Sequence, residues 1–222
     1  MALTPSTAYN TIAQRVDAVR RVLAHIDTTI VAADAPRRDL LYLEKASTYI
    51  WLSSALEAFV NDFLAETLVG IADSGAAKAQ LRPSLFAIVV GSELDGLQDV
   101  RRLKMWKRRA SLFAHLTSPD PANLDPSHLP LDGRTLEPDH FDTIWQVFAF
   151  AGPSLPGPLQ RLALVDLSEA RNKLAHGEED PVPFGRRKTV HELRRLAGFV
   201  EDVAEHLFLA GTTYVVARQY LR

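Results

Sequence analysis

Apolar residues spaced alternately by three and four positions are the feature that most constrains the fold of this chain. One such stripe runs through the first long segment, Ser6 to Ala33, and comprises Tyr9, Ile12, Val16, Val19, Leu23, Ile26 and Ile30. Charged side chains, Arg15 among them, fall elsewhere around the same helix. This spacing is typical of an amphipathic helix that packs in a bundle.

Similar patterns predict helices along most of the chain. The further expected helices cover residues 37–72, 97–116, 139–150, 159–175 and 189–209. The segment from Tyr49 to Val60 is apolar on more than one face, so its helix is expected to be central. The apolar run 85–90 fits either a strand or a buried helix, and the tail from residue 212 is ambiguous. The sequence therefore predicts an all-α bundle of five or more helices.

Segments rich in proline, glycine and polar residues separate these helices. Residues 118–138 are rich in Pro, Asp and Asn and predict a loop that is long for a compact domain. Residues 152–158 mark a second break, and an acidic, proline-containing loop is expected after Gly177. None of these segments divides the chain convincingly. We therefore expect a single domain, 1–222, with a long loop near 117–138.

Composition excludes several classes of protein. The 222 residues include no cysteine, which excludes disulfide scaffolds, Cys-ligated metal sites and cysteine nucleophiles. The net charge is −2, so nucleic-acid binding requires a local basic patch. No apolar run is long enough to span a bilayer, and Met1 to Ser6 lack the features of a signal peptide. The expectation is a cytoplasmic protein without a membrane partner.

Motifs for nucleotide or metal binding are incomplete. Gly70 and Gly75 have the spacing of a phosphate-binding loop, but Ala76 stands where that loop needs lysine. A di-iron bundle needs Glu-x-x-His on two helices, and only Glu137 to His140 fits. We expect no metal site and no cofactor.

An arginine followed five residues later by a histidine occurs three times in this chain. The pairs are Arg20 with His25, Arg171 with His176, and Arg186 with His191. In the second pair alone, the arginine precedes a compact polar residue, Asn172, and the histidine sits at a predicted helix end directly before glycine. The context therefore singles out Arg171 and His176.

These residue types at this spacing suit phosphate chemistry. Asn172 and His176 share a helix face, so the amide is expected to hydrogen-bond the imidazole. The negative end of the helix dipole favours a charged imidazolium, which suits acid–base work near neutral pH. The Arg171 guanidinium can bind a phosphate and oppose charge that develops on its oxygens. One copy supplies one acid or base, and a second copy across a two-fold axis would supply the other. The alternative is a charged helix end with a solvent-exposed histidine.

The segment 171–177, Arg-Asn-Lys-Leu-Ala-His-Gly, resembles the signature of the HEPN superfamily, Arg-[Asn/Asp/His]-x3-His. With alanine before the histidine and glycine after it, the segment is similar to the RiboL-PSP-HEPN or MAE-type branch of prokaryotic toxin and phage-defence proteins. Residues 42–49 and 53–60 resemble the first core helices of that branch. Beyond these short segments the resemblance extends only to the order of the helices.

The resemblance implies an up-and-down helical bundle that forms a homodimer, with the two motifs facing one cleft. It implies a metal-independent endoribonuclease of toxin or abortive-infection type, in which the ribose 2′-hydroxyl attacks the adjacent phosphate and leaves a 2′,3′-cyclic phosphate. His176 would be the general acid or base, Arg171 the stabiliser of the transition state, and Asn172 the residue that orients them. An additional glutamate would be Glu57 or, second, Glu44.

The implied partners are RNA, a second copy of the chain and a cognate antitoxin. An alternative is a non-catalytic HEPN module that binds RNA, a nucleotide or a partner protein, and a plain helical scaffold is a third. HEPN toxins silenced by nucleotidylation commonly carry tyrosine two residues after the histidine. This chain has Glu178 there, so that mode of control is not expected.

Two basic regions are candidates for contact with RNA. The first comprises Lys173, which lies within the motif, and Arg186, Arg187 and Lys188, which follow it. The second, within residues 101–109, has six cations and no acid, and it predicts either a phosphate-binding face or a solvated helix face. An apolar stripe in the same helix is expected to be core, and it consists of Leu103, Trp106, Ala110 and Phe113.

Overall fold

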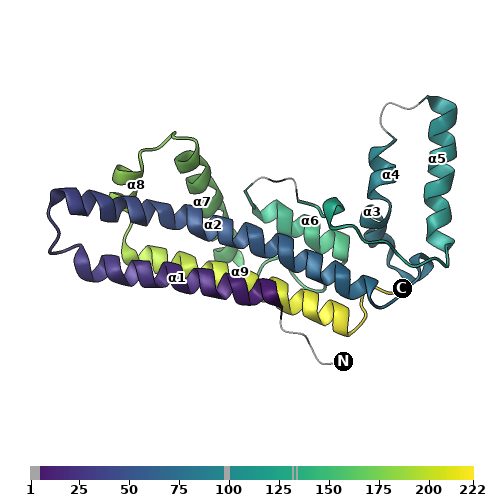
Figure 1. Ribbon diagram of the computed structural model, residues 1–222, viewed down its shortest axis with the longest axis horizontal. Helices are drawn as coiled ribbons and strands as arrows, with labels where there is room; N and C mark the ends of the chain where they lie inside the picture. Colours follow the sequence, from purple (N-terminus) through teal and green to yellow (C-terminus); the bar gives the residue numbers. More distant parts are fainter. Residues whose placement is uncertain (1–5, 98–100, 132, 134) are drawn as a thin grey trace. The chain divides into compact units, whose positions relative to one another are not determined.

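The computed structural model describes residues 6–97, 101–131, 133 and 135–222, and their regular structure is helical (Figure 1). Apart from helices, the described residues contain two isolated β-bridges, Ala77 with Pro121 and Leu81 with Leu221. The prediction of an all-α fold is confirmed. The prediction that Met1 to Ser6 do not form a signal peptide concerns mainly residues 1–5, which lie outside the described residues.

The chain groups into two compact units. Unit 1 comprises Met1–Phe63, Gly133–Asp139 and Leu155–Phe208, and unit 2 comprises Leu64–Asp132, His140–Ser154 and Leu209–Arg222. Two long helices, α2 (Ala35–Ala72) and α9 (Val190–Val216), contribute residues to both. Because these two boundaries fall inside continuous helices, no loop composition marks them in the sequence.

Unit 1 contains α1 (Thr7–Thr29), α7 (Pro158–Ala175) and α8 (Pro181–Arg187), together with parts of α2 and α9. The Ser6 hydroxyl caps α1 by accepting a hydrogen bond from the Tyr9 amide. Most of the predicted stripe of α1 is buried, namely Ile12, Val16, Val19, Leu23 and Ile26. The apolar middle of α2 is buried on more than one face, as its pattern predicted.

Helix α8 corrects the prediction of a loop between Gly177 and Thr189. The Asp180 side chain caps this helix by accepting a hydrogen bond from the Val182 amide, and Pro181 occupies its first turn. An aspartate followed by proline is a helix start, because the carboxylate satisfies a free amide and proline has none to satisfy. Phe184 and Gly185 are buried, so tertiary packing stabilises this helix in addition to the cap.

Unit 2 contains α3 (Phe86–Val89), α4 (Gly91–Asp95), α5 (Arg102–Ala114) and most of α6 (Pro138–Phe148). Short 3₁₀ helices connect them, at Lys78–Gln80, Pro83–Leu85, His115–Thr117 and Pro126–His128. The ambiguous run 85–90 is therefore helical. Aromatic rings form part of the core, with Tyr214 packed edge-on against Phe150 at 5.0 Å between centroids.

The apolar stripe of α5 is not core, which corrects the prediction for this helix. Leu103, Trp106 and Phe113 are 73%, 57% and 71% exposed. The half-buried side of the helix carries Met105 and Arg108 instead, and the Arg108 guanidinium donates a hydrogen bond to the Gly96 carbonyl. Periodicity identifies an apolar face but does not show that a neighbour covers it. Residues 98–100 of the predicted helix lie outside the described residues.

The last helix is longer than the sequence predicted, because α9 continues to Val216 rather than ending near Leu209. The chain then turns at Arg218, whose φ is +52°, and folds back within unit 2. The Arg82 amide bonds the Tyr220 carbonyl at 2.8 Å, and Tyr220 is buried. The tail is thus an ordered part of unit 2.

Candidate active site

Helix α7 ends in a Schellman turn that contains the second half of the motif. His176 is the C-cap residue directly after Ala175, the last residue of the helix, and Gly177 follows with φ at +71°. The Glu178 amide bonds the Lys173 carbonyl at 2.9 Å, and the Gly177 amide bonds the Leu174 carbonyl at 3.3 Å. This hydrogen-bond pattern requires a left-handed residue after the helix, which glycine adopts without strain. The predicted helix stop at Gly177 is confirmed.

Asn172 fixes Arg171 rather than His176. Its side-chain oxygen accepts hydrogen bonds from the Arg171 Nη1 at 3.2 Å and from the hydroxyl of buried Thr135 at 2.8 Å. The contact between Asn172 and His176 is instead in the backbone, where the histidine amide bonds the Asn172 carbonyl at 3.0 Å. The predicted side-chain bond between them is therefore wrong, since the oxygen is turned toward the arginine and the threonine.

The His176 side chain is exposed at the end of α7. Arg171 is half-buried one and a half turns earlier, on the same helix and in the same unit. The arrangement thus combines a guanidinium held by a neighbouring amide with an imidazole open to a ligand. This combination is suited to binding a phosphate beside a group that can gain or lose a proton.

The two candidate glutamates lie on α2. Glu57 is half-buried and accepts a hydrogen bond from the Ser53 hydroxyl at 2.9 Å. Glu44 has one carboxylate oxygen buried without a hydrogen-bond partner. Across the described residues, neither carboxylate is bonded or ion-paired to Arg171 or His176. The structure therefore does not join either glutamate to the motif.

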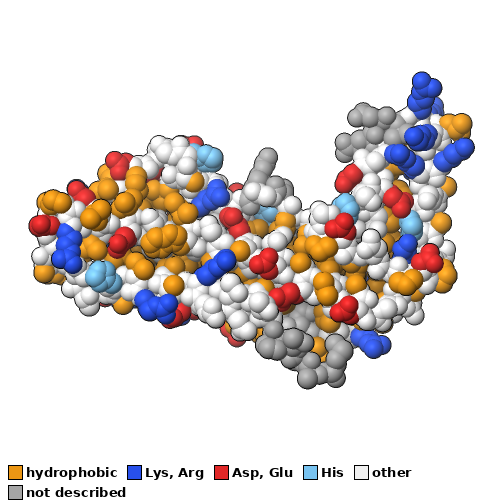
Figure 2. All heavy atoms as spheres, viewed as in Figure 1, with side chains coloured by type: hydrophobic (Ala, Val, Ile, Leu, Met, Phe, Trp, Pro, Cys, Tyr) orange, Lys and Arg blue, Asp and Glu red, His pale blue; other side chains and the backbone are white. Residues whose placement is uncertain are grey.

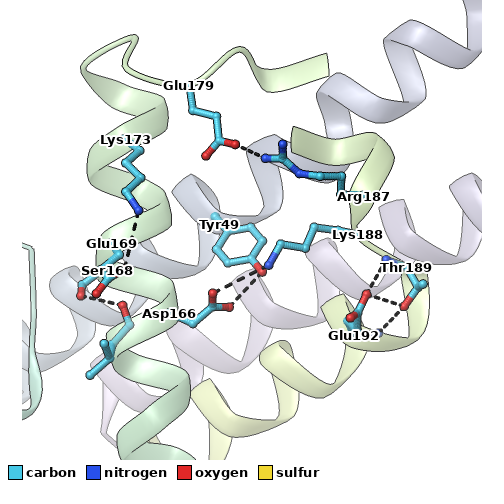
Figure 3. A network of polar contacts seen from close by, with 11 residues as sticks. Tyr49, Asp166, Ser168, Glu169, Lys173, Glu179, Arg187, Lys188, Thr189 and Glu192 are labelled. Carbon is cyan, nitrogen blue, oxygen red and sulfur yellow. Dashed lines mark hydrogen bonds and ion pairs between the residues drawn. The ribbon is translucent and has the colours of Figure 1, made fainter. Parts of the chain in front are cut away.

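The four basic residues predicted to contact RNA each have a carboxylate partner. Lys173 pairs with Glu169 at 3.7 Å, Arg186 with Asp39 at 3.5 Å, Lys188 with Asp166 at 3.7 Å, and Arg187 with Glu179. Figure 3 shows three of these pairs, those of Lys173, Arg187 and Lys188. The structure thus places these four cations in one unit and neutralises each locally.

Lys188 lies at the centre of a polar cluster between α2, α7 and α8 that sequence reasoning missed. Its Nζ lies 5.2 Å from the centre of the Tyr49 ring and 5.3 Å from that of Phe184. The Tyr49 hydroxyl donates to Asp166 at 3.0 Å, and both contacts to Asp166 are visible in Figure 3. Burial raises the pKa of Tyr49, and the charge of Asp166 raises it further, so the phenol keeps its proton.

Two further polar groups border this cluster. Thr189 and Glu192 form a capping box at the start of α9, in which the Thr189 amide donates to the carboxylate at 2.6 Å and the Glu192 amide donates to the threonine hydroxyl at 3.1 Å. The spacing Thr-x-x-Glu was a signal for this start. Lys45 is only 4% exposed, and burial lowers the pKa of its ammonium. No sequence signal marks a lysine as buried.

The described residues contain no group of three or more His, Cys, Asp or Glu side chains placed to hold a metal ion. None of the described helices combines the length and the apolar character needed to cross a membrane.

A comparison with protein-family models, with curated proteins and with solved structures finds no match to this chain. The resemblance to HEPN proteins therefore rests on the sequence segments alone, residues 42–49, 53–60 and 171–177.

Proposed function

We propose that this protein is a metal-independent endoribonuclease of HEPN type whose active site is completed by a second copy of the chain. One observation carries the proposal: Arg171 and His176 occupy the end of one helix, where Asn172 holds the guanidinium and the imidazole is open. The resemblance of residues 171–177 to the HEPN signature supports it.

The chemistry requires one group that accepts a proton and another that donates one. In the proposed reaction, the His176 imidazole takes the proton of a ribose 2′-hydroxyl, whose oxygen then bonds to the adjacent phosphorus. The bond from phosphorus to the 5′-oxygen breaks, and the second copy's imidazolium gives its proton to that oxygen. Arg171 opposes the negative charge that develops on the phosphate oxygens. The products are a 2′,3′-cyclic phosphate and a free 5′-hydroxyl.

In this proposal, RNA phosphates replace the carboxylates that are paired with Lys173, Arg186, Arg187 and Lys188. Three of these side chains are more than half exposed, and Lys188 is a quarter exposed. Exposed ion pairs contribute about 0–1 kcal/mol each, so a phosphate can replace a carboxylate at little cost. The proposal accordingly predicts RNA affinity that falls with increasing salt.

The direct test compares wild type with His176→Ala on labelled single-stranded RNA in the presence of EDTA. We expect wild type to yield fragments that end in 2′,3′-cyclic phosphate and the variant to lose at least a hundredfold in rate, because general acid–base catalysis contributes about 10²–10⁴-fold. His25→Ala is the matched control, since His25 is exposed and also lies five residues after an arginine. Equal cleavage by wild type and His176→Ala would refute the proposal.

The need for a second copy is tested separately. If two copies form the site, the rate per chain falls on dilution in parallel with the dimer fraction measured by sedimentation. A rate per chain that is independent of dilution while the dimer dissociates would exclude a shared site. In cells, the toxin interpretation predicts growth arrest by wild type and not by His176→Ala.

The second candidate function is a non-catalytic module that binds RNA, a nucleotide or a partner protein. The acidic surroundings favour it: Glu178, Glu179 and Asp180 directly follow Gly177, and all four nearby cations are paired. It predicts salt-sensitive RNA binding by wild type with no cleavage, and weaker binding by Arg171→Ala.

A further inference from the structure

Helix α5 of unit 2 carries a stripe of large apolar side chains that face solvent. Leu103, Trp106 and Phe113 are each more than half exposed, and Ala110 lies between them on the same face. At about 100° per residue, these four positions span an arc of roughly 80° on the helix surface. Isolated exposed apolar residues are ordinary, but a continuous stripe of this kind marks a surface that binds something.

Cations flank this stripe on both sides. By the same helical geometry, Lys104 and Lys107 border one edge, and Arg102 and Arg109 border the other. The Arg109 guanidinium lies 5.2 Å from the centre of the Trp106 ring. Figure 2 shows the Lys and Arg side chains gathered along this helix at the upper right of the view.

Among the residues that the structure describes, the flanking cations lack the carboxylate partners seen in unit 1. No Asp or Glu occurs between Arg101 and Pro119 in the sequence. Among the described residues, no carboxylate lies within ion-pair distance of Arg102, Lys104, Lys107 or Arg109. The outer face of α5 therefore combines an apolar centre with uncompensated positive charge, and its occupant must be both apolar and anionic.

We propose that α5 binds the surface of an anionic lipid bilayer. The stripe of Leu103, Trp106 and Phe113 enters the boundary between headgroups and acyl chains, and the flanking lysines and arginines contact anionic headgroups. A helix with Trp, Phe and Leu on one face and cations around it is typical of interfacial helices. Such a helix lies in the plane of the membrane and needs no spanning segment. From the sequence we expected no membrane partner, and the proposal departs from that expectation because the stripe is exposed.

The shape of the surface favours lipid over RNA. Proteins that bind single-stranded RNA commonly combine a basic groove with aromatic platforms. The outer face of α5 is the convex side of a helix, and the aliphatic Leu103 offers no ring for a base to stack on. The cleft beside α5, about 320 Å³ in volume, is lined by Glu93, Arg108 and Ser111 among others and does not include the stripe. A flat anionic bilayer matches both the apolar stripe and the charges.

The test measures co-sedimentation of the full chain with vesicles. We expect binding to vesicles that contain phosphatidylglycerol and little binding to phosphatidylcholine alone. The double substitution Leu103→Ser and Phe113→Ser is expected to weaken binding about a hundredfold. The variant lacks two large apolar side chains that wild type transfers from water into the membrane. Replacing both Lys104→Gln and Lys107→Gln is expected to weaken it roughly 25-fold, about fivefold for each charge.

Matched controls separate the surface from general effects. Val31→Ser changes an apolar residue that is 90% exposed in unit 1, and Arg15→Gln with Arg37→Gln removes two exposed cations there. Neither control is expected to change vesicle binding. In a Trp51→Phe background, Trp106 is the exposed tryptophan, so its emission is expected to shift to the blue and to be quenched by brominated lipid.

The proposal is independent of the nuclease activity, so failure of one does not imply failure of the other. Equal binding to neutral and anionic vesicles would overturn it, as would unchanged binding by the Leu103→Ser, Phe113→Ser variant. The proposal would also be overturned if α5 binds RNA rather than lipid. In that case wild type binds labelled single-stranded RNA but no vesicles, and the Leu103→Ser, Phe113→Ser variant no longer binds the RNA. Circular dichroism checks that each variant remains folded.

Discussion

The two basic regions of this protein look alike in sequence and differ in structure. Beside the motif in unit 1, Lys173, Arg186, Arg187 and Lys188 each pair with a carboxylate. On α5 in unit 2, Arg102, Lys104, Lys107 and Arg109 have no carboxylate partner among the described residues. The first region is neutralised by the fold, and the second remains available to an anionic ligand.

The difference teaches that local charge density is a poor guide to which cations are free. Asp39 precedes Arg186 by 147 residues, and Asp166 precedes Lys188 by 22, so the fold brings these partners together. Around α5, by contrast, the sequence itself lacks acids from residue 101 to 119. A long acid-free run is therefore better evidence of free cations than a short basic cluster.

The largest effect is expected from a substitution that pushes α8 away from α2. Such a change would disrupt the region of unit 1 in which the cations are paired with carboxylates. A Cβ at Gly185 would overlap the backbone carbonyl of Tyr42, so Gly185→Ala must displace α8 and with it Phe184, which packs on Tyr49. We expect a loss of about 2–3 kcal/mol in unfolding free energy, measured by urea denaturation.

Gly198→Ala is the control for Gly185→Ala. Gly198 lies inside α9, where a Cβ meets no atom within 4 Å. Alanine is expected to stabilise the helix there by about 0.5–1 kcal/mol. If Gly185→Ala unfolds at the same urea concentration as wild type, the close approach of α8 to α2 is not a constraint.

A smaller effect is expected from Lys45, a buried cation in unit 1 that extends the comparison. Burial lowers its pKa, opposed by the charge of Glu192. Between this lowered pKa and the usual value near 10.4, the unfolded chain binds more protons than the folded chain, so stability rises with pH. Lys45→Met removes the buried charge and is expected to be more stable than wild type by about 1 kcal/mol at neutral pH.

The pH dependence distinguishes this effect from a simple gain in packing. The advantage of Lys45→Met is expected to shrink as the pH rises through the window below about 10.4, measured by urea denaturation at several pH values. Tyr49, whose pKa is raised in the folded state, is present in both proteins, so its contribution to the pH dependence cancels in the difference. An advantage that stays constant with pH would show that packing alone is responsible.

The smallest expected effect sharpens the contrast between paired and free cations. Asp39→Asn removes the partner of Arg186, and we expect affinity for heparin at low salt to rise about two- to threefold, the value of one exposed ion pair. Asp62→Asn removes an equal charge from an exposed position on the same helix. If both variants bind heparin equally well, net charge rather than the local pair controls binding.

The periodic helices were predictable because the capping residues and the apolar stripes indicate the same helix bounds. Helix α7 was expected at residues 159–175 and spans Pro158–Ala175, since Gly177 fixes its end. The predictions failed where tertiary context decides. The tail of α9 is helical because it packs in unit 2, and the stripe of α5 is exposed because no described element covers it. The two-unit grouping depends on contacts that cross long sequence separations.

The candidate site was predictable in its residues but not in its contacts. The context of Arg171 and His176 identified the helix end, which the structure confirms. Helical spacing alone placed Asn172 beside His176, yet the hydroxyl of Thr135, 37 residues away, and the adjacent guanidinium bind the amide oxygen instead. Spacing shows which groups can meet, and competing partners decide which do. The proposed roles of Glu57 and of the cations remain predictions.

The contacts of Asn172 also bear on the degeneracy of the motif. Its side chain uses one oxygen, and among the described residues its NH₂ group donates no hydrogen bond. The position thus demands a lone pair next to the arginine rather than an amide as such. Aspartate provides the same lone pair, and so does the unprotonated ring nitrogen of a histidine. In this protein, the requirement at position 172 is therefore for one hydrogen-bond acceptor, which a single atom satisfies.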